Sequence, residues 1–200
     1  KYMKNPIRVL VGFDSIADAV DDSVSANKRV EQIVEVIEDR QREARLREIL
    51  KRVHKKNNRI LIFALYKKEA ERLENALRRD GWNCGSIHGN KQQGARTAAL
   101  SSFKEGICPL LIATDVAARG LDIPNVEVVI NFTFPLTIED YVHRIGRTGR
   151  AGKQGISYTF FQPTDKAHAG ALQNVLRQVN QDVPEELAKF GNTVKKKEHK

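Results

Sequence analysis

Short apolar runs alternate with amphipathic helical patterns, and this alternation constrains the fold more than any other feature of the chain. Residues 60–65 are a continuous apolar run of strand length, and 68–79 follow with apolar residues at helical spacing. Strands that alternate with helices of about 10–15 residues favour a parallel sheet covered on both faces. The sequence therefore predicts an α/β fold of three layers with a mainly parallel central sheet.

The same patterns give a complete set of expected elements. Helices often end at glycine, as after 68–79 and 92–104, and β-branched residues mark the strands. A polar stretch at 13–28 has little periodicity and is interpreted as a linker. Strands are predicted at 7–11, 30–37, 60–65, 83–87, 110–113, 126–131 and 156–161, and helices at 44–53, 68–79, 92–104, 116–118, from 138, 166–179 and 184–190.

Polar residues follow several of the predicted strands in turn. They include Tyr66, His88, Thr114 and Thr133. Ligands of parallel sheets bind outside the carboxyl ends of the strands. One edge of the sheet is therefore expected to carry the chemistry.

The stretch 141–152 holds arginines and glycines in a fixed pattern. Thr137 and Asp140 have capping-box spacing, so a helix is expected to begin near Ile138, with His143 and Arg147 on one shared face. A solvated surface helix would need no such regularity. The apolar residues Ile138, Tyr141, Val142 and Ile145 would form its buried face.

Two arginines of this stretch are candidates for holding a polyanion. Arg147 and Arg150 are separated by Gly149, and glycine allows a sharp turn that lets both guanidiniums converge. The planar guanidinium binds phosphate oxygens and keeps its charge. The pattern therefore favours a phosphate-bearing ligand.

A second polar stretch covers residues 113–122. Thr114 and Asp115 would begin a helix whose free N–H groups can bind a phosphate, although Asp115 could also serve only as an N-cap. Arg119 and Gly120 would turn the chain and present Asp122, whose carboxylate can accept hydrogen bonds from ribose hydroxyls.

These stretches resemble motifs of one family. His143-Arg144-x-Gly-Arg147-x-Gly-Arg150 resembles motif VI of superfamily 2 helicases in its DEAD-box form, and 113–122 resembles DEAD-box motif V. Gln93 and Arg96, which alone would suggest a solvated face, resemble motif IVa. Residues 60–66 resemble motif IV. The turn at Thr133 departs from the family, which often has Asp there.

The resemblance implies the second RecA-like domain of an ATP-dependent RNA helicase. Residues 1–29 would be the end of the first domain and the linker, 30–180 the C-terminal RecA-like domain, and 181–200 an extension with a basic tail. The site roles follow from the motif matches. Arg147 and Arg150 would be arginine fingers, Asp122 would bind the ATP ribose, His143 and Arg144 would couple the domains, and Gln93, Arg96, Thr114, Asp115 and Gly120 would bind the RNA backbone.

Residues that hold ATP and Mg²⁺ are expected on the first domain. Gly152-Lys153 is followed by Gln154, so it is no P-loop, and Asp-Glu-Ala-Asp does not occur. The 200-residue chain alone is therefore predicted to be inactive as an ATPase. ATP and Mg²⁺ would act in the longer protein, and no metal ligands are assigned within this chain.

Composition agrees with these expectations. The net charge of +9 favours a polyanionic partner, which the resemblance identifies as RNA bound without regard to sequence. Cys84 and Cys108 lack metal-site spacing and are expected to be buried, in a reducing compartment. No membrane segment is evident. The sequences at 133–137 and 195–199 resemble those of the nucleolar DEAD-box members that act in ribosome assembly. The resemblance implies a nucleolar or nuclear location and pre-ribosomal partners. A cytoplasmic location is the alternative.

Two other functions stay open at this point. One is a DNA-acting helicase of the same superfamily, which the His143 form of motif VI disfavours. The other is a non-enzymatic RNA-binding module, which would describe the isolated chain.

Overall fold

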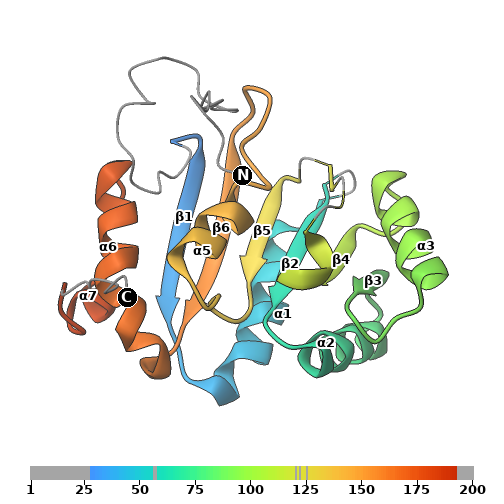
Figure 1. Ribbon diagram of the computed structural model, residues 1–200, viewed down its shortest axis with the longest axis horizontal. Helices are drawn as coiled ribbons and strands as arrows, with labels where there is room; N and C mark the ends of the chain where they lie inside the picture. Colours follow the sequence, from blue (N-terminus) through green and yellow to red (C-terminus); the bar gives the residue numbers. More distant parts are fainter. Residues whose placement is uncertain (1–27, 56–57, 120, 122, 125, 193–200) are drawn as a thin grey trace, which may run out of the picture.

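Six parallel strands form the central sheet of the protein (Figure 1). The computed structural model describes residues 28–55, 58–119, 121, 123–124 and 126–192, so the strand predicted at 7–11 and nearly all of the linker at 13–28 lie outside them. The sheet has the order β1-β6-β5-β2-β4-β3. Its strands are β1 (Val30–Val36), β2 (Ile60–Ala64), β3 (Cys84–Ile87), β4 (Leu110–Thr114), β5 (Val128–Asn131) and β6 (Gly155–Phe161).

Alternate residues of β2 explain the three layers. Ile60 and Ile62 pack with the helices on one face of the sheet, whereas Leu61 and Phe63 pack with those on the other. Because both faces are covered, the whole strand is apolar. The first face is covered by α1 (Arg42–Val53) and α2 (Lys67–Arg79), and the second by α3 (Gln93–Lys104), α4 (Asp115–Ala118), α5 (Ile138–Ile145), α6 (Ala169–Gln178) and α7 (Glu185–Ala188). The predicted α/β/α fold is confirmed.

Some predicted boundaries were wrong for local reasons. The helix predicted at 166–179 is a 3₁₀ segment, Pro163–His168, followed by α6, and Pro163 begins the 3₁₀ turns. β5 begins at Val128 because the Val126 amide donates to the Arg147 carbonyl at 3.1 Å. α7 is shorter than the predicted helix at 184–190.

The described part of the C-terminal extension packs on the domain. Leu187 is fully buried with β1 and α6, and Gln173 Nε2 donates to the Leu187 carbonyl at 3.2 Å. Gln181 accepts from the Gln32 amide at 2.6 Å and donates to the Val30 carbonyl at 2.6 Å. The segment therefore covers the outer strand of the sheet, and the domain boundary predicted after residue 180 stays a prediction.

Both cysteines are free and buried, as predicted. Burial raises the pKa of the Cys84 thiol to about 11 and also raises the pKa of Cys108.

No helix in the described ranges has the length and apolar character needed to span a bilayer.

Candidate functional site

The carboxyl ends of the central strands bring the predicted polar residues to one edge. Tyr66 follows β2 and is exposed, while Thr114 at the end of β4 is buried and occupies the N-cap position of α4 without a capping hydrogen bond from its side chain. Thr133 follows β5 and is half-buried. His88 follows β3 and is buried, which lowers its pKa, with the nearby Lys91 charge acting in the same direction. The expected edge therefore exists.

A two-point ion pair joins the stretches 113–122 and 141–152. Arg144 Nε donates to Asp115 Oδ1 at 2.7 Å, and Nη2 donates to Oδ2 at 2.6 Å. The Arg144 side chain is 1% exposed and its guanidinium lies 5.0 Å from the centre of the Phe63 ring. Such a buried, bidentate pair fixes the orientation of both side chains. It locks α4 against α5.

Local sequence explains how α5 presents its polar face. Thr137 caps the helix by accepting from the Asp140 amide at 3.0 Å. Tyr141 is completely buried, stacks on Phe134, and donates to Gln32 at 2.7 Å. These contacts anchor the predicted apolar face. Outside this apolar face, Arg144 reaches Asp115 of α4, a helix on the same face of the sheet (Figure 1).

A second ion pair joins Asp140 of α5 to Arg119, the residue that follows α4. Arg119 Nη2 donates to Asp140 Oδ1 at 2.7 Å. Burial acts to raise the pKa of Asp140, but hydrogen bonds with Arg119 and Thr137 leave it below its usual value. The predicted capping box is half correct, since the Thr137 bond forms while Arg119 occupies the Asp140 carboxylate.

A small pocket of about 50 Å³ forms where these residues meet. Asp115 is paired with Arg144 and Asp140 with Arg119, so both carboxylates of the pocket are neutralised. Arg147 also lines the pocket, and within the described part of the chain its side chain has no hydrogen bond or ion pair. The lining residues are Phe63, Asp115, Ala118, Arg119, Asp140, His143, Arg144 and Arg147.

The loop after α5 departs from the helix that the sequence predicted. α5 ends at Ile145, so His143 and Arg147 do not share a helical face, although both line the pocket. Gly149 and Gly152 have φ of 68° and 75°, which glycine adopts without strain. The tight turn predicted between Arg147 and Arg150 is therefore confirmed.

Arg150 lies beyond this turn and is exposed. Its Nε donates to the carbonyl of Gly146, the residue that ends α5. Arg150 is not among the residues that line the pocket. Its predicted convergence with Arg147 on one ligand stays a prediction.

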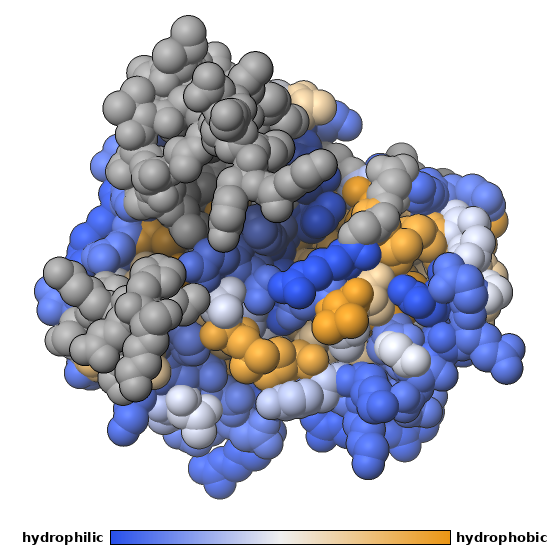
Figure 2. Space-filling model, viewed as in Figure 1, coloured by the Kyte–Doolittle hydropathy of each residue, from blue (hydrophilic) through white to orange (hydrophobic). Residues whose placement is uncertain are grey.

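The predicted RNA-binding residues of α3 lie against α4. Arg96 Nη1 donates to Gln93 at 3.0 Å, and Nη2 lies 3.4 Å from the Ala117 carbonyl. The buried Arg96 Nε has no partner within the described residues. Figure 2 shows apolar side chains over α4 and the turn before α5, where Val116 and Leu136 are exposed.

The remaining predicted site residues belong to the stretches 113–122 and 141–152. Gly120 and Asp122 lie outside the described residues. Asp115 is the first residue of α4 and Thr114 its N-cap, so the interpretation of Asp115 as the N-cap was wrong. The RNA-binding role predicted for Asp115 and the coupling role of Arg144 stay predictions. Within the described ranges, no cluster of His, Cys, Asp or Glu is placed to hold a metal ion.

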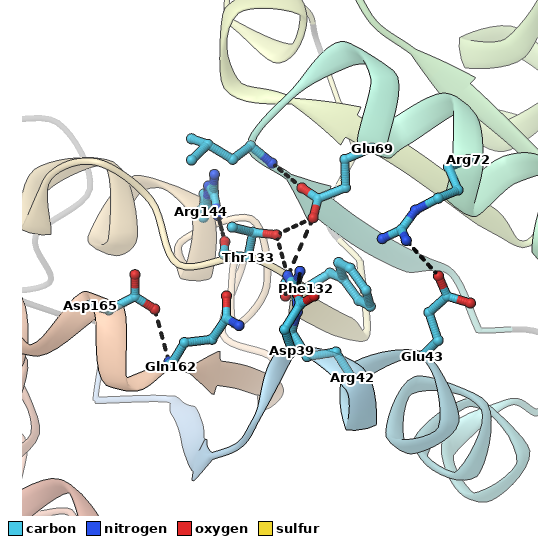
Figure 3. Close-up of polar contacts among 11 residues, drawn as sticks. Asp39, Arg42, Glu43, Glu69, Arg72, Phe132, Thr133, Arg144, Gln162 and Asp165 are labelled. Atoms are coloured by element: carbon cyan, nitrogen blue, oxygen red, sulfur yellow. Dashed lines mark hydrogen bonds and ion pairs between the residues drawn. The ribbon is translucent and has the colours of Figure 1, made fainter.

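Sequence reasoning missed a second buried arginine beside the site. Arg42 donates to the Phe132 carbonyl at 2.9 Å and to Thr133 Oγ1 at 2.7 Å (Figure 3). Glu69 accepts from Thr133 Oγ1 at 2.7 Å. The one feature of the sequence that pointed to these contacts was Thr133, a polar residue after a strand. Its partners Arg42 and Glu69 are 91 and 64 positions away, so no local pattern connects them to it.

A more voluminous groove than the pocket between α4 and α5 lies elsewhere, along α2. It measures about 830 Å³ and is open. None of the residues in motifs V and VI lines it, so it is separate from the pocket between α4 and α5. Its lining residues are Lys68, Glu71, Arg72, Asn75, Arg78, Arg79 and Asn90.

Comparisons with known proteins identify the family of the chain. The model of the helicase conserved C-terminal domain matches residues 41–152. The chain is 61% identical over 98% of its length to DEAD-box ATP-dependent RNA helicase 5 of Arabidopsis thaliana, and 57% identical over 99% to ATP-dependent RNA helicase DBP3 of Saccharomyces cerevisiae. It covers 35% and 37% of these relatives, about a third of their length.

Solved structures show the same relationship. The crystal structure of the Escherichia coli DEAD-box protein SrmB bound to regulator of ribonuclease activity A matches with a TM-score of 0.63 at 33% identity, covering 78% of this chain and 92% of that one. The yeast DEAD-box splicing factor Prp28 matches with a TM-score of 0.74 at 32% identity, covering 88% and 39%. The chain therefore belongs to the DEAD-box family of RNA helicases, of which it forms the C-terminal RecA-like domain.

Proposed function

We propose that this chain is the second half of an ATP-driven RNA-remodelling enzyme that separates short duplexes locally. The observation that carries the proposal is that the Arg147 side chain lines the pocket without a hydrogen bond or ion pair to the described residues. Every carboxylate in the pocket between α4 and α5 has an arginine partner, while Arg147 has none in the described residues. An unpaired guanidinium in a half-buried position is suited to a phosphate.

The pocket fits one end of a nucleotide and not the whole of it. A volume of about 50 Å³ is far below the roughly 300–1,000 Å³ of a small-molecule site. ATP would therefore lie between this face and a first RecA-like domain, which would hold the base, most of the phosphates and Mg²⁺. Bound ATP supplies the phosphoryl group whose transfer to water drives remodelling.

This chain would supply positive charge at the point where negative charge develops in the transition state. Arg147 and Arg150 would contact the γ-phosphate when the domains close, as arginine fingers. Asp122 would bind the ribose, and His143, which is exposed on α5, would meet the first domain. Arg144 is buried, so we propose that it couples the domains by holding Asp115 and α4 in place.

RNA would bind along α3 and α4. Gln93, Arg96, Thr114, Asp115 and the backbone at Gly120 would contact the sugar-phosphate chain. The Arg96 Nε, which has no partner among the described residues, supports this assignment. Such contacts carry little base information, which suits an enzyme that accepts many RNAs.

The experiment that tests this function uses a protein that joins this chain to its first domain. RNA-stimulated ATP hydrolysis and unwinding of a short RNA duplex are measured for the wild type and for Arg147→Ala. We expect both activities in the wild type and their loss in the variant. Equal activity with DNA, lacking the 2′-hydroxyl, would instead support the DNA-acting alternative.

We also propose a role in ribosome assembly, in the nucleus or nucleolus, with pre-ribosomal partners. The support is the sequence of the turn at 133–137 and of the basic tail at 195–199, which lies outside the described residues. Co-sedimentation of the tagged protein with pre-ribosomal particles is the expected result. A purely cytoplasmic distribution would contradict it.

A further inference from the structure

We infer that Arg42 and Glu69 are positioning residues, which hold the turn after β5 where Arg144 and α4 require it. The inference rests on the proposed function for its effect on catalysis. Neither residue belongs to the stretches at 113–122 and 141–152. Arg42 begins α1 and Glu69 lies in the first turn of α2, both on the face of the sheet opposite α4 and α5.

The Arg42 side chain contacts both a backbone carbonyl and a side chain of the turn after β5. It is 5% exposed, unusually buried for an arginine. Nη1 donates to the Phe132 carbonyl at 2.9 Å and to Thr133 Oγ1 at 2.7 Å. The guanidinium also lies 4.4 Å from the centre of the Phe132 ring. One side chain therefore fixes two successive residues of the turn.

Glu69 completes this attachment from α2. Its Oε1 lies 3.3 Å from Arg42 Nη1 and accepts from Thr133 Oγ1 at 2.7 Å, while Oε2 accepts from the Leu65 amide at 3.0 Å (Figure 3). The carboxylate thus ties the end of β2 to the turn after β5. Asp39 supplies a second negative charge to Arg42, which lowers the pKa of Asp39.

Arg144 holds the same turn, from the opposite face. Its Nη1 donates to the Thr133 carbonyl at 2.7 Å and lies 3.4 Å from Asn131 Oδ1, while Nε and Nη2 hold Asp115. If the turn shifts, the Thr133 carbonyl leaves Arg144 and the Asp115 pair loses one of its supports. A continuous set of contacts therefore runs from Arg42 through the turn to α4.

Thr133 makes this arrangement dependent on Glu69. A threonine hydroxyl can accept from Arg42 and donate to Glu69 at once, but it brings no charge of its own. Glu69 and Asp39 then supply the carboxylates that face Arg42, and of these two Glu69 also accepts from the turn. An aspartate at position 133 would put a carboxylate within reach of the same guanidinium, so Thr133→Asp is expected to rescue loss of the Glu69 charge.

The experiment uses the two-domain protein and two independent readouts. The first is amide hydrogen exchange of α4, and the second is kcat for RNA-stimulated ATP hydrolysis. The variants are Arg42→Met, Glu69→Gln, Thr133→Val and the double change Glu69→Gln with Thr133→Asp. Arg45→Met is the matched control, because Arg45 also lies in α1 and pairs with Glu35 at 2.7 Å but contacts no part of the turn.

We expect exchange of α4 to rise at least about tenfold in the first three variants, because local opening becomes easier. We expect kcat to fall by about 10- to 10²-fold with a smaller change in KM for ATP, as a displaced catalytic group would produce. The double change should recover most of the loss seen in Glu69→Gln, and Arg45→Met should match the wild type. All assays are run well below each melting temperature.

Two results would overturn the inference. One is unchanged α4 exchange in Thr133→Val and Glu69→Gln, the two variants that keep side-chain volume. The other is an equal loss in Arg45→Met, which would indicate general destabilisation. If the wild type shows no RNA-stimulated hydrolysis, the proposed function fails, and the exchange measurements still decide the inference.

Discussion

Arg42 and Arg144 donate to two atoms of one residue, Thr133. Nη1 of Arg42 lies 2.7 Å from its hydroxyl, and Nη1 of Arg144 lies 2.7 Å from its carbonyl. Each guanidinium also lies over a phenylalanine ring and has a carboxylate partner. The polar edge of the sheet is thus built around a turn whose conformation both faces of the domain determine.

Replacing either predicted arginine finger should cost turnover rather than RNA affinity. We expect Arg147→Ala and Arg150→Ala in the two-domain protein each to reduce kcat, by less than the roughly 10³–10⁵ of a single arginine finger because two would share one phosphate. Lysine should rescue poorly because it lacks the planar fork. ATPase at saturating RNA is measured beside RNA affinity with a non-hydrolysable ATP analogue, and thermal melting is the control. Near-normal turnover in both variants would refute the assignment.

Arg96→Ala should have the reverse effect. RNA affinity should fall uniformly across sequences, and the slope of log K against log salt should decrease by about 1. Turnover at saturating RNA should change less. Arg40→Ala is the matched control, since Arg40 is an exposed arginine outside the predicted RNA surface. A loss that depends on base sequence would contradict a phosphate contact.

The 200-residue chain alone should bind RNA weakly and hydrolyse no ATP. Its sequence has no P-loop and no Asp-Glu-Ala-Asp, while its net charge is +9. Binding should weaken steeply as salt rises from 50 to 200 mM, because phosphate contacts release counterions. Purified chain with RNA-stimulated turnover, free of contaminating ATPase, would disprove the first statement, and salt-independent binding the second.

Glu74 should stabilise the fold in a pH-dependent way. Burial acts to raise its pKa, but Lys91 at 2.8 Å and Ser86 at 2.5 Å bind the carboxylate and leave the pKa below its usual value. This stabilisation is present above the unfolded pKa of about 4.3 and is lost as pH falls through the lower folded pKa. Glu74→Gln should therefore cost about 1–3 kcal/mol at pH 7.

Denaturant unfolding at pH 7 and near pH 3 measures this difference, which should shrink in acid. Glu71→Gln is the control, because Glu71 is an exposed carboxylate on the same helix. A Glu74→Gln effect that is constant across this pH range would show that its charge is unimportant.

Gly155→Ala should destabilise the loop that carries the arginines. A Cβ at Gly155 would overlap with the Thr148 side chain and lie 2.5 Å from the Gly149 nitrogen. Overpacking of this kind costs typically about 1–3 kcal/mol. Gly94→Ala is the comparison, since its Cβ would meet nothing within 4 Å in α3 and alanine favours a helix. Equal melting temperatures for Gly155→Ala and wild type would contradict the packing shown here.

The sequence predicted what depends on local periodicity and little that depends on distant partners. The apolar run at 60–65 and the helical spacing at 68–79 were enough to predict β2 and α2. Arg42 sits in a polar break of the pattern, where a solvated side chain is the normal expectation. Its burial arises because Phe132 and Thr133, about 90 positions away, bring a carbonyl and a hydroxyl to it.

In the candidate site too, local features were predicted and contacts between distant residues were not. The spacing of Arg147 and Arg150 around Gly149 predicted a tight turn, and the structure has one. The pairing of Asp115 with Arg144 could not be predicted, because it depends on how α4 and α5 pack on the sheet. Local sequence patterns identify the candidate site residues, and tertiary packing determines which of their charged side chains form ion pairs with one another.

The sheet order has a consequence for synthesis on the ribosome. β1 pairs only with β6 among the described strands, matching Val30 with Gly155, so the first of these strands must wait for roughly 125 further residues. At about 5–20 residues per second, that delay is on the order of 6–25 s. During that interval β1 lacks its partner strand, and its unpaired N–H and C=O groups are a template for pairing with another chain.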